Sequence, residues 1–365
     1  MNRQTVTSAR GPEPSHIPEH PFAATIRTVA KGEKLGRSLT MEEAHEAMRV
    51  VLEGRVEPVQ LGAFLAVLRY RKETGAELAG FALAARDCLT CGTLPATALD
   101  WPSYADRHRQ LPYFVLAALM IAGTGIRVLM HGIEGEGPAA TRALLHVLGV
   151  PLASDADEAE RHMAARSFAY LPLEAICPPL DRLLALRPFL GLRSPANTYA
   201  RELNPAAAPC QIQGVFHPNY ADLHAHAASR LGQPRATIFK GGGGECQVNP
   251  LKPMALTLVR DGEVRRETWP ALLEADDSGW RDEPLVLERV LELWRGKRTA
   301  AGPEAAIIGT AAVALHLTGS APTPEKALAS ARDLWESRDR DLYPASVAAS
   351  TISGRSAGSG PIGPK

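Results

Sequence analysis

The chain has 365 residues, of which 45% are hydrophobic and 22% are charged, and this ordinary composition excludes disordered, collagenous and coiled-coil chains. Because 40 Lys and Arg residues balance 40 Asp and Glu residues, no overall charge indicates a nucleic-acid or membrane partner, and such a partner would need a local patch. Five cysteines, an odd number, cannot form a complete disulfide framework in a chain of this length, which favours a reducing, cytoplasmic location.

Polar segments flank the central part of the chain. Residues 1–21 are rich in proline and polar side chains, and we expect a disordered arm without the apolar core of a signal peptide. Residues 346–365 are rich in Ser, Gly and Pro, which predicts a flexible tail. The apolar run at 115–121 is broken by Gly123 before it reaches membrane-spanning length, so no membrane partner is expected.

The first ordered block, residues 22–98, has the pattern of a small helical domain. Thr40 and Glu43 form a capping-box sequence, and apolar residues recur at helical spacing after them. Pro58 opens a second helix, whose apolar stripe is wide enough to bury more than one partner helix, while Arg69 is expected to stay in water. Residues 77–85 predict a third helix.

Between residues 99 and 345, short apolar runs alternate with helical patterns. Strands are expected at 126–130, 168–171, 212–216 and 236–239. Helices are expected at 114–122, 139–148, 220–231, 285–294, 304–317 and 324–337. Asp261 and Gly262 separate two extended runs and predict a β-hairpin. The expected class is α/β, with a small all-helical N-terminal domain packed on a larger α/β domain that has a mostly parallel central sheet.

Six motifs occur in order along the chain. They are GRSLTMEEAHEAMRVVLEGRVEPVQLGAFLAVLRYRKETGAELAGF at 36–81, VLMHG at 128–132, LLHVLGV at 144–150, RPFLGLRSPANTYARELNPA at 187–206, QGVFHP at 213–218 and ATIFKGGGGE at 236–245. Together they resemble the anthranilate phosphoribosyltransferase family, within glycosyltransferase family 3. The resemblance covers about residues 25–340 and implies a dimerising helical domain, an α/β domain and an active site in the cleft between them.

The residues that would carry phosphoribosyl transfer in that family are only partly present. Family members hold the pyrophosphate of phosphoribosyl pyrophosphate with amides of a glycine-rich turn, but no glycine occurs between residues 99 and 114. Glu134 and Glu136 add negative charge to the next substrate loop. The family's metal-binding acidic pair falls at Glu245 and Cys246. Mg²⁺ is therefore expected at Glu245 only if phosphoribosyl transfer is retained, and otherwise no cofactor is expected.

The sequence FKGGGGECQVNPLKP at 239–253 is similar to the signature of the YbiB-type branch of this family. Members of that branch resemble the transferases, lack their substrate motifs and are implicated in binding nucleic acid as homodimers. The resemblance therefore implies two partners, which are a second copy of the chain, bound through the helical domain, and a nucleic acid.

A local excess of basic residues lies between residues 181 and 240, where the sequence has seven Lys and Arg residues and three Asp and Glu residues. Because each phosphate contact releases counterions, we expect a nucleic-acid backbone to contact a subset of these cations. The expected contacts are Arg187, Arg193, Arg201, Arg235 and Lys240. The alternative is a solvated surface whose arginines pair with other groups, and the sequence leaves both interpretations open.

Residues at the expected strand ends are candidates for a ligand loop in the cleft, because ligands of open α/β sheets bind at that edge. They are His131, Gly132, Asn197, Gly241, Gly242, Gly243 and Gly244. The glycines could cradle a phosphate or simply form a turn, and His131 could contact a ligand or be held by hydrogen bonds. Cys88 and Cys91 have zinc-like spacing but lack a second pair, so no metal is expected there.

These patterns favour a non-catalytic homologue that binds nucleic acid with little sequence preference as a homodimer. One alternative is an anthranilate phosphoribosyltransferase or related glycosyltransferase, in which Arg187, Asn197 and Glu245 would bind the acceptor and the metal. Another is a small-molecule sensor that uses the interdomain cleft. No residue is assigned a catalytic role.

Overall fold

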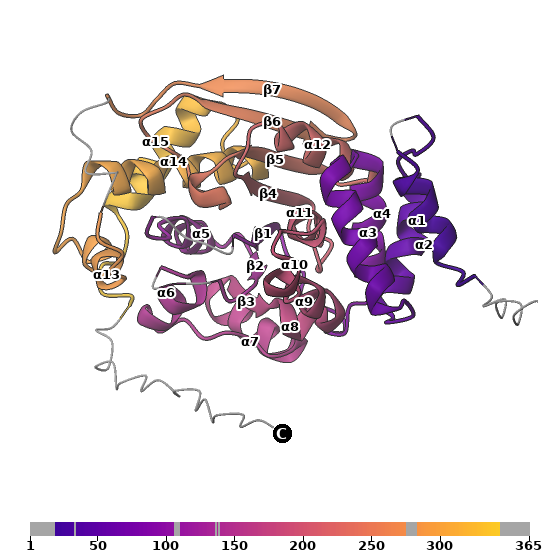
Figure 1. Cartoon of the computed structure of the whole chain (residues 1–365). Coiled ribbons are helices and arrows are strands. Elements are labelled where there is room, and N and C mark those ends of the chain that lie inside the picture. The colour runs from indigo at the N-terminus through magenta and orange to yellow at the C-terminus, as the bar shows by residue number, and fades with distance from the viewer. Residues whose placement is uncertain are drawn as a thin grey trace, which may run out of the picture.

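The computed structural model describes residues 19–32, 34–105, 110–135, 137, 139–274 and 283–343. Figure 1 shows a helical part, formed by the N-terminal elements, beside a larger α/β part built on a seven-stranded sheet. This architecture confirms the predicted fold class. The predicted arm lies almost entirely, and the predicted tail entirely, outside the described residues.

Four helices form the helical part. They are α1 (Ala23–Ala30), α2 (Met41–Leu52), α3 (Pro58–Arg71) and α4 (Gly75–Asp87). Thr40 caps α2 in the predicted capping box, since its hydroxyl accepts from the Glu43 amide and its own amide donates to the Glu43 carboxylate. Helices α2 and α4 approach closely at Gly80, where a Cβ would lie 2.3 Å from the carbonyl oxygen of Met41.

A single mixed sheet organises the α/β part. Its strands are β1 (Leu99–Ser103), β2 (Val128–Gly132), β3 (Phe168–Pro172), β4 (Cys210–Val215), β5 (Arg235–Lys240), β6 (Met254–Arg260) and β7 (Glu263–Trp269). The strand order is β3-β2-β1-β4-β5-β6-β7, and the first five strands are parallel. The antiparallel strands β6 and β7 form the predicted hairpin, with Asp261 and Gly262 both at positive φ in its turn.

The central strand β1 is absent from the expected elements. All five of its residues are buried, and it pairs with β2 and β4. The sequence did not predict this strand because it contains Asp100 and Pro102, and both residue types are depleted in strands. The structure accommodates Asp100 through hydrogen bonds from His131 and Gln211.

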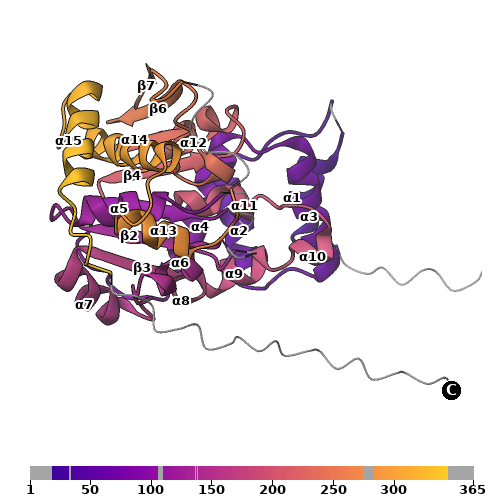
Figure 2. The ribbon, with the colours of Figure 1, turned by 90° about the vertical axis from the view of Figure 1, so that its left-hand side faces the viewer.

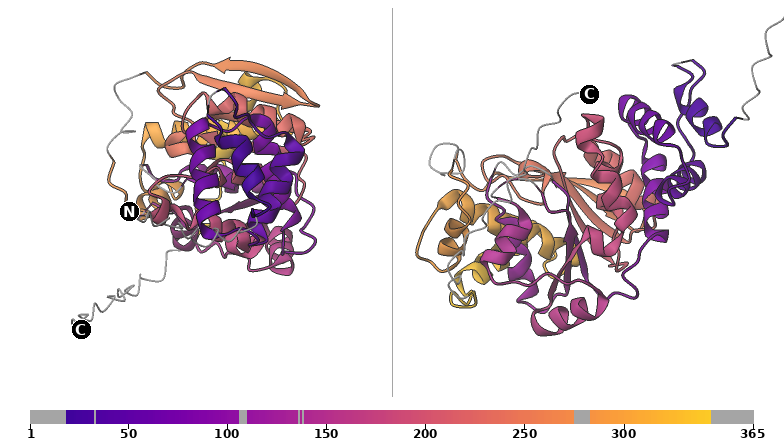
Figure 3. Two further views of the ribbon diagram at one scale, coloured as in Figure 1. Left: turned by 45° about the vertical axis from the view of Figure 1, so that its right-hand side comes forward. Right: turned by 60° about the horizontal axis from the view of Figure 1, so that its bottom comes forward.

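Helices cover both faces of the sheet. On one face lie α5 (Phe114–Ala122), α6 (Thr141–Val147), α13 (Glu288–Trp294), α14 (Ala301–Thr318) and α15 (Pro324–Glu336), which share a core with Val128 and Met130. On the other lie α7 (Ala156–Arg166) and α12 (Tyr220–Arg230), and Leu129 points to this side, as strand alternation requires. The helical part packs against α12 through α4. Figures 2 and 3 show these layers, with the helical part standing to one side of the sheet.

Short helical turns connect β3 to β4 at the carboxyl edge of the parallel strands. They are α8 (Leu173–Ile176), α9 (Pro178–Leu184), α10 (Arg187–Leu190), α11 (Ala196–Tyr199) and η1 (Ala200–Glu202). Arg86 of α4 anchors the helical part to this connection by donating to the carbonyl oxygens of Glu202 and Leu203. Within the described ranges, no helix has both the length and the apolar character needed to cross a membrane.

Candidate functional site, a basic pocket between the two parts

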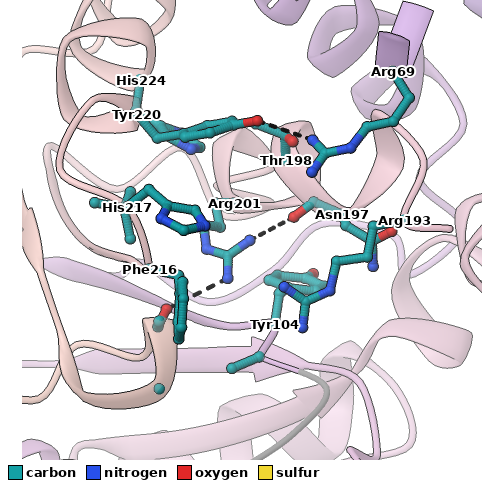
Figure 4. Close-up of a pocket in the computed structure, with 14 residues that line it drawn as sticks. Arg69, Tyr104, Arg193, Asn197, Thr198, Arg201, Phe216, His217, Tyr220 and His224 are labelled. Carbon is teal, nitrogen blue, oxygen red and sulfur yellow. Dashed lines mark hydrogen bonds between the residues drawn. The ribbon is translucent and has the colours of Figure 1, made fainter. Parts of the chain in front are cut away.

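A pocket that is open to solvent lies where the carboxyl ends of β1, β4 and β5 meet helix α3, and Figure 4 shows its lining residues. Five residues predicted as site residues come together in its lining. They are Arg193, Asn197, Arg201, Gly243 and Gly244. The pocket therefore combines members of the expected phosphate-contact set with members of the expected ligand loop.

Three arginines make the pocket basic. Arg69 comes from α3, Arg193 precedes α11, and Arg201 belongs to η1. None of the described lining residues is an Asp or a Glu. An anion that enters would be attracted by guanidinium groups in a partly enclosed space, where charges attract each other more strongly than in bulk water.

The guanidinium of Arg201 is held in place by backbone carbonyl groups. Its Nε donates to Gly214 across 3.0 Å, and its terminal nitrogens donate to the carbonyl oxygens of Asn197 and Gly244. Burial lowers the pKa of Arg201 from its ordinary value, an effect that the nearby charge of Glu245 opposes. Arg201 thus joins β4, η1 and the glycine turn into one wall of the pocket.

Arg69 links the two parts of the molecule across the pocket. Its Nη1 donates to the hydroxyl of Tyr220 at the start of α12 across 2.9 Å, and Figure 4 shows this contact at the pocket rim. Arg69 was expected to lie in water, but it is only half-exposed. Phe216 and His217 lie beside Tyr220, with ring centroids of Phe216 and His217 4.8 Å apart. None of these four lining residues was predicted as a site residue from the sequence.

Glu245 lies behind the pocket and does not project into it. Its Oε1 accepts hydrogen bonds from the Ala105 amide across 2.7 Å and from the Ser103 hydroxyl across 3.2 Å. Burial raises the pKa of Glu245 to about 7, although the charge of Arg201 and the Ala105 amide act in the opposite direction. Its second oxygen has no hydrogen-bond partner among the described residues.

The surroundings of Glu245 do not fit a magnesium site. Mg²⁺ requires a near-octahedral set of oxygen ligands, several of them water. The Glu245 carboxylate is 2% exposed and is already engaged by Ala105 and Ser103. Among the described residues, no group of three or more His, Cys, Asp or Glu side chains could hold a metal ion.

The glycine turn after β5 uses its amides internally. The amides of Gly241, Gly242, Gly244 and Glu245 donate to the backbone carbonyls of Val215, Gln247, Gly241 and Gly242, respectively. The turn requires glycine, because Gly243 and Gly244 adopt positive φ and a Cβ on Gly241 would lie 1.6 Å from the carbonyl oxygen of Glu245. These four amides are therefore unavailable to cradle a phosphate, and the turn contributes shape to the pocket.

His131 and Gly132, at the end of β2, stabilise the sheet and do not line the pocket. His131 is fully buried, and its ring nitrogens lie 2.8 Å from the Tyr104 hydroxyl and 3.0 Å from an Asp100 oxygen. Gly132 allows close approach of β1, since a Cβ there would lie 1.8 Å from the Ser103 carbonyl oxygen. Neither residue lines the pocket, although Tyr104 does.

A buried chain of hydrogen bonds runs beneath the pocket from Tyr104 to His224, which both line it. From His131 and Asp100 it continues through Gln211, Gln213, Glu202 and His224, with successive donor–acceptor distances between 2.7 and 3.0 Å. Buried polar groups that are linked in this way fix a unique packing, although the Oε1 of Gln213 has no partner among the described residues. The chain thus holds both ends of the pocket floor in place.

The other expected phosphate contacts do not converge on the pocket. Lys240 ends β5 at the carboxyl edge, whereas Arg235 begins the same strand and donates to the Thr318 carbonyl at the opposite edge. At about 3.3 Å per residue, the two cations lie roughly 16 Å apart along the strand. Arg187 begins α10 and is not part of the pocket lining.

Comparison with protein families matches both parts of the chain to one family. Residues 24–88 match the helical bundle domain of a glycosyl transferase family, and residues 114–337 match its α/β domain. The chain is 28% identical to an anthranilate phosphoribosyltransferase of Moorella thermoacetica, over 83% of this chain and 91% of the relative. It is also 28% identical to the uncharacterized protein YbiB of Escherichia coli, over 66% of this chain and 77% of the relative.

Solved structures show the same architecture. Anthranilate phosphoribosyltransferase from Thermus thermophilus superposes with a TM-score of 0.72 at 25% identity, covering 87% of this chain and 95% of that one. The enzyme from Saccharomyces cerevisiae, solved in complex with PRPP and Mg, superposes with a TM-score of 0.69 at 17% identity, covering 87% and 93%.

Proposed function

Because the chain belongs to the glycosyl transferase family with a helical bundle domain and an α/β domain, we propose that it is a member that has lost phosphoribosyl transfer and binds nucleic acid. It does so as a homodimer, with phosphate contacts supplied by the basic pocket and little dependence on base sequence. The observation that carries this proposal is the hydrogen bond from the Ala105 amide to the Glu245 carboxylate.

That hydrogen bond lies where the resembling family would hold a pyrophosphate. Ala105 follows β1 directly, in the glycine-free stretch that replaces the family's glycine-rich turn. The Ala105 amide already donates to the Glu245 carboxylate and is not available to a pyrophosphate. Loss of donor binding therefore leaves the fold intact while removing the reaction that the fold usually performs.

Binding of nucleic acid is supported by the charge of the pocket. Arg69 and Arg193 line an open, acid-free pocket, as far as its described lining goes, beside the rings of Phe216, His217 and Tyr220. Phosphate contacts supply most of the affinity of sequence-independent binding, and aromatic rings add stacking with any base. The arrangement suits a phosphate and a neighbouring base of a single strand.

The homodimer is supported by an apolar stripe on α3. Val59, Ala63 and Tyr70 recur at spacings of four and seven, so they share one face of the helix. Val59 is 79% exposed and Tyr70 is 89% exposed, although α3 carries apolar residues all round. A helix with that composition is normally buried on every side, which a second copy of the chain would achieve here.

The test of binding is a fluorescence titration with a labelled single strand of about 20 nucleotides at salt concentrations from about 50 to 200 mM. Replacing Arg69 and Arg193 by Gln should weaken binding and reduce the salt slope by roughly 0.7 for each arginine that neutralised a phosphate. Arg235→Gln, at the opposite edge of the sheet, is the matched control and should change neither quantity. Weak binding by the wild-type protein, or affinity indifferent to salt, would reject the proposal.

Phosphoribosyl transfer is the second candidate, favoured by the similarity to anthranilate phosphoribosyltransferases along most of the chain. Calorimetry with phosphoribosyl pyrophosphate, with and without Mg²⁺, discriminates between the two, because only phosphoribosyl transfer predicts that Mg²⁺ strengthens binding. A third candidate, a small-molecule sensor, predicts that the pocket binds a small anion tightly while single-stranded DNA does not compete for it.

A further inference from the structure

A second basic concavity, which we call the basic hollow, lies on the helical part. It is formed by the end of α1 and the turn that follows, and it is open to solvent. Its four cations are Arg27, Lys31, Lys34 and Arg37, and none of the other described residues that line it is acidic. The basic excess counted at residues 181–240 does not include these cations.

Two of these cations are partly neutralised and two are not. Arg27 pairs with Glu19, and Arg37 pairs with Glu43 across 2.6 Å, in exposed ion pairs of the kind that contribute little. Lys31 and Lys34 are exposed and make no ion pair with any described acid. Glu33, which separates them in the sequence, lies outside the described residues.

Helix α3 connects the basic hollow to the pocket. Arg71 donates to the Val29 carbonyl and lies under the hollow, where a Cβ on Gly36 would be 2.8 Å from its Nη1. Arg69, two residues earlier, donates to Tyr220 in the pocket. Residues two apart on an α-helix point about 200° apart, so the two arginines leave α3 on opposite sides.

The pocket and the basic hollow therefore flank one helix, whose diameter with side chains is about 10 to 12 Å. The C-terminal end of α3 bridges them and carries exposed Lys72. A helix C-terminus itself bears partial negative charge, which Arg71 and Lys72 offset. Arg69 in the pocket, Lys72 at the end of α3 and Lys31 in the basic hollow are thus cations on successive sides of this helix end, while the acid Glu73 beside Arg69 is buried.

The geometry points to a path for a single nucleic-acid strand that leaves the pocket, passes the C-terminal end of α3 and enters the basic hollow, where Lys31 and Lys34 contact its phosphates. This inference rests on the proposed function and adds a second contact region to it. No aromatic ring lines the described hollow, so contact there is with the backbone and independent of base identity.

The test compares short and long oligothymidylates with the intact protein. Lys31→Gln combined with Lys34→Gln should leave binding of a strand of about 4 nucleotides unchanged, because such a strand fills the pocket alone. For a strand of about 20 nucleotides, the double variant should lower affinity more than about tenfold at 50 mM salt and reduce the salt slope by roughly 1.4. The control replaces exposed Lys326 and Arg332 on α15 by Gln and should behave as wild type at both lengths. Helices α15 and α1 lie at opposite ends of the molecule (Figure 2).

The outcomes separate this inference from the proposed function. If the wild-type protein binds neither strand, both are overturned. If it binds the long strand with an affinity and slope that Lys31→Gln and Lys34→Gln do not change, the basic hollow is overturned and the pocket stands. Equal weakening of short and long strands would also overturn the path, because it would show a general charge effect in place of a separate contact.

Discussion

The carboxylate of Glu245 accepts a hydrogen bond from the amide of Ala105 across 2.7 Å, and this contact joins the turn after β5 to the end of β1. The two residues are 140 positions apart in the chain. The Glu245 carboxyl group is buried next to Ser103 and near the charge of Arg201, and burial raises its pKa. Stability should therefore depend on the protonation state of one side chain.

Glu245→Gln should remove a pH dependence of stability between about pH 4.5 and 7. Folding raises the pKa of Glu245 from 4.5 to about 7, so in this window the folded protein holds a proton that the unfolded chain has lost. The unfolded state then binds fewer protons, and the free energy of unfolding falls as pH rises. The full difference corresponds to about 3 kcal/mol. Urea unfolding at several pH values, with wild type and variant side by side, measures it.

In that experiment, the wild-type free energy of unfolding should fall from pH 4.5 to 7. Above pH 7 Glu245 should contribute no further change. The variant should lack that fall, because Gln has no proton to lose. Parallel curves for the two proteins would show that Glu245 titrates in the folded protein as it does in the unfolded chain.

Arg201→Gln should destabilise the protein by about 2 to 4 kcal/mol. The change withdraws the guanidinium donors from the carbonyl oxygens of Asn197, Gly214 and Gly244, and buried acceptors without partners are costly. The shift of the urea midpoint measures the effect. Arg235→Gln is the control, since the Arg235 side chain is exposed and its hydrogen bond to the Thr318 carbonyl is long, at 3.4 Å. A shift of similar size there would contradict this explanation.

Local signals explain which elements the sequence predicted well. The capping box at Thr40 and the hairpin at Asp261 and Gly262 each depend on a few adjacent residues, and the structure contains both. Strand β1 was not predicted because an Asp such as Asp100 is unusual in a buried strand. In the structure His131 and Gln211, from neighbouring strands, form hydrogen bonds with it. Helix α7 was not predicted because it has few apolar residues that face the core. Among its described residues only Ala159 and Met163 are buried.

The candidate site was predictable only where its residues lie close in sequence. Arg193 and Arg201 belong to one motif and line one pocket. Arg69 and Tyr220 are 151 positions apart in the sequence, and no local pattern predicted their contact. Counting charge between residues 181 and 240 also grouped Arg235 with Lys240, although a strand separates them. Periodicity shows which face a side chain takes, but not which distant element it meets.

Gly132→Ala should cost about 3 kcal/mol or more of stability. A methyl group at this position would lie 1.8 Å from the carbonyl oxygen of Ser103, so β1 and β2 would have to separate at the pocket edge. Gly149→Ala is the matched control, because no heavy atom lies within 4 Å and only its φ of 68° is unfavourable, at about 1 kcal/mol. Thermal unfolding distinguishes the two, and equal losses would show that the close approach of β1 is not limiting.

Val59→Glu should convert the proposed dimer into a monomer. If a second copy covers the stripe on α3, the substitution buries a carboxylate without a partner, at a cost of several kcal/mol. A loss of about 3 kcal/mol weakens association by more than 100-fold, which sedimentation velocity resolves. Val264→Glu on β7, 37% exposed, is the control and should remain dimeric. A wild-type protein that sediments as a monomer would leave Val59 and Tyr70 exposed to solvent and would contradict the assembly. A dimer unchanged by Val59→Glu would place the interface on another surface.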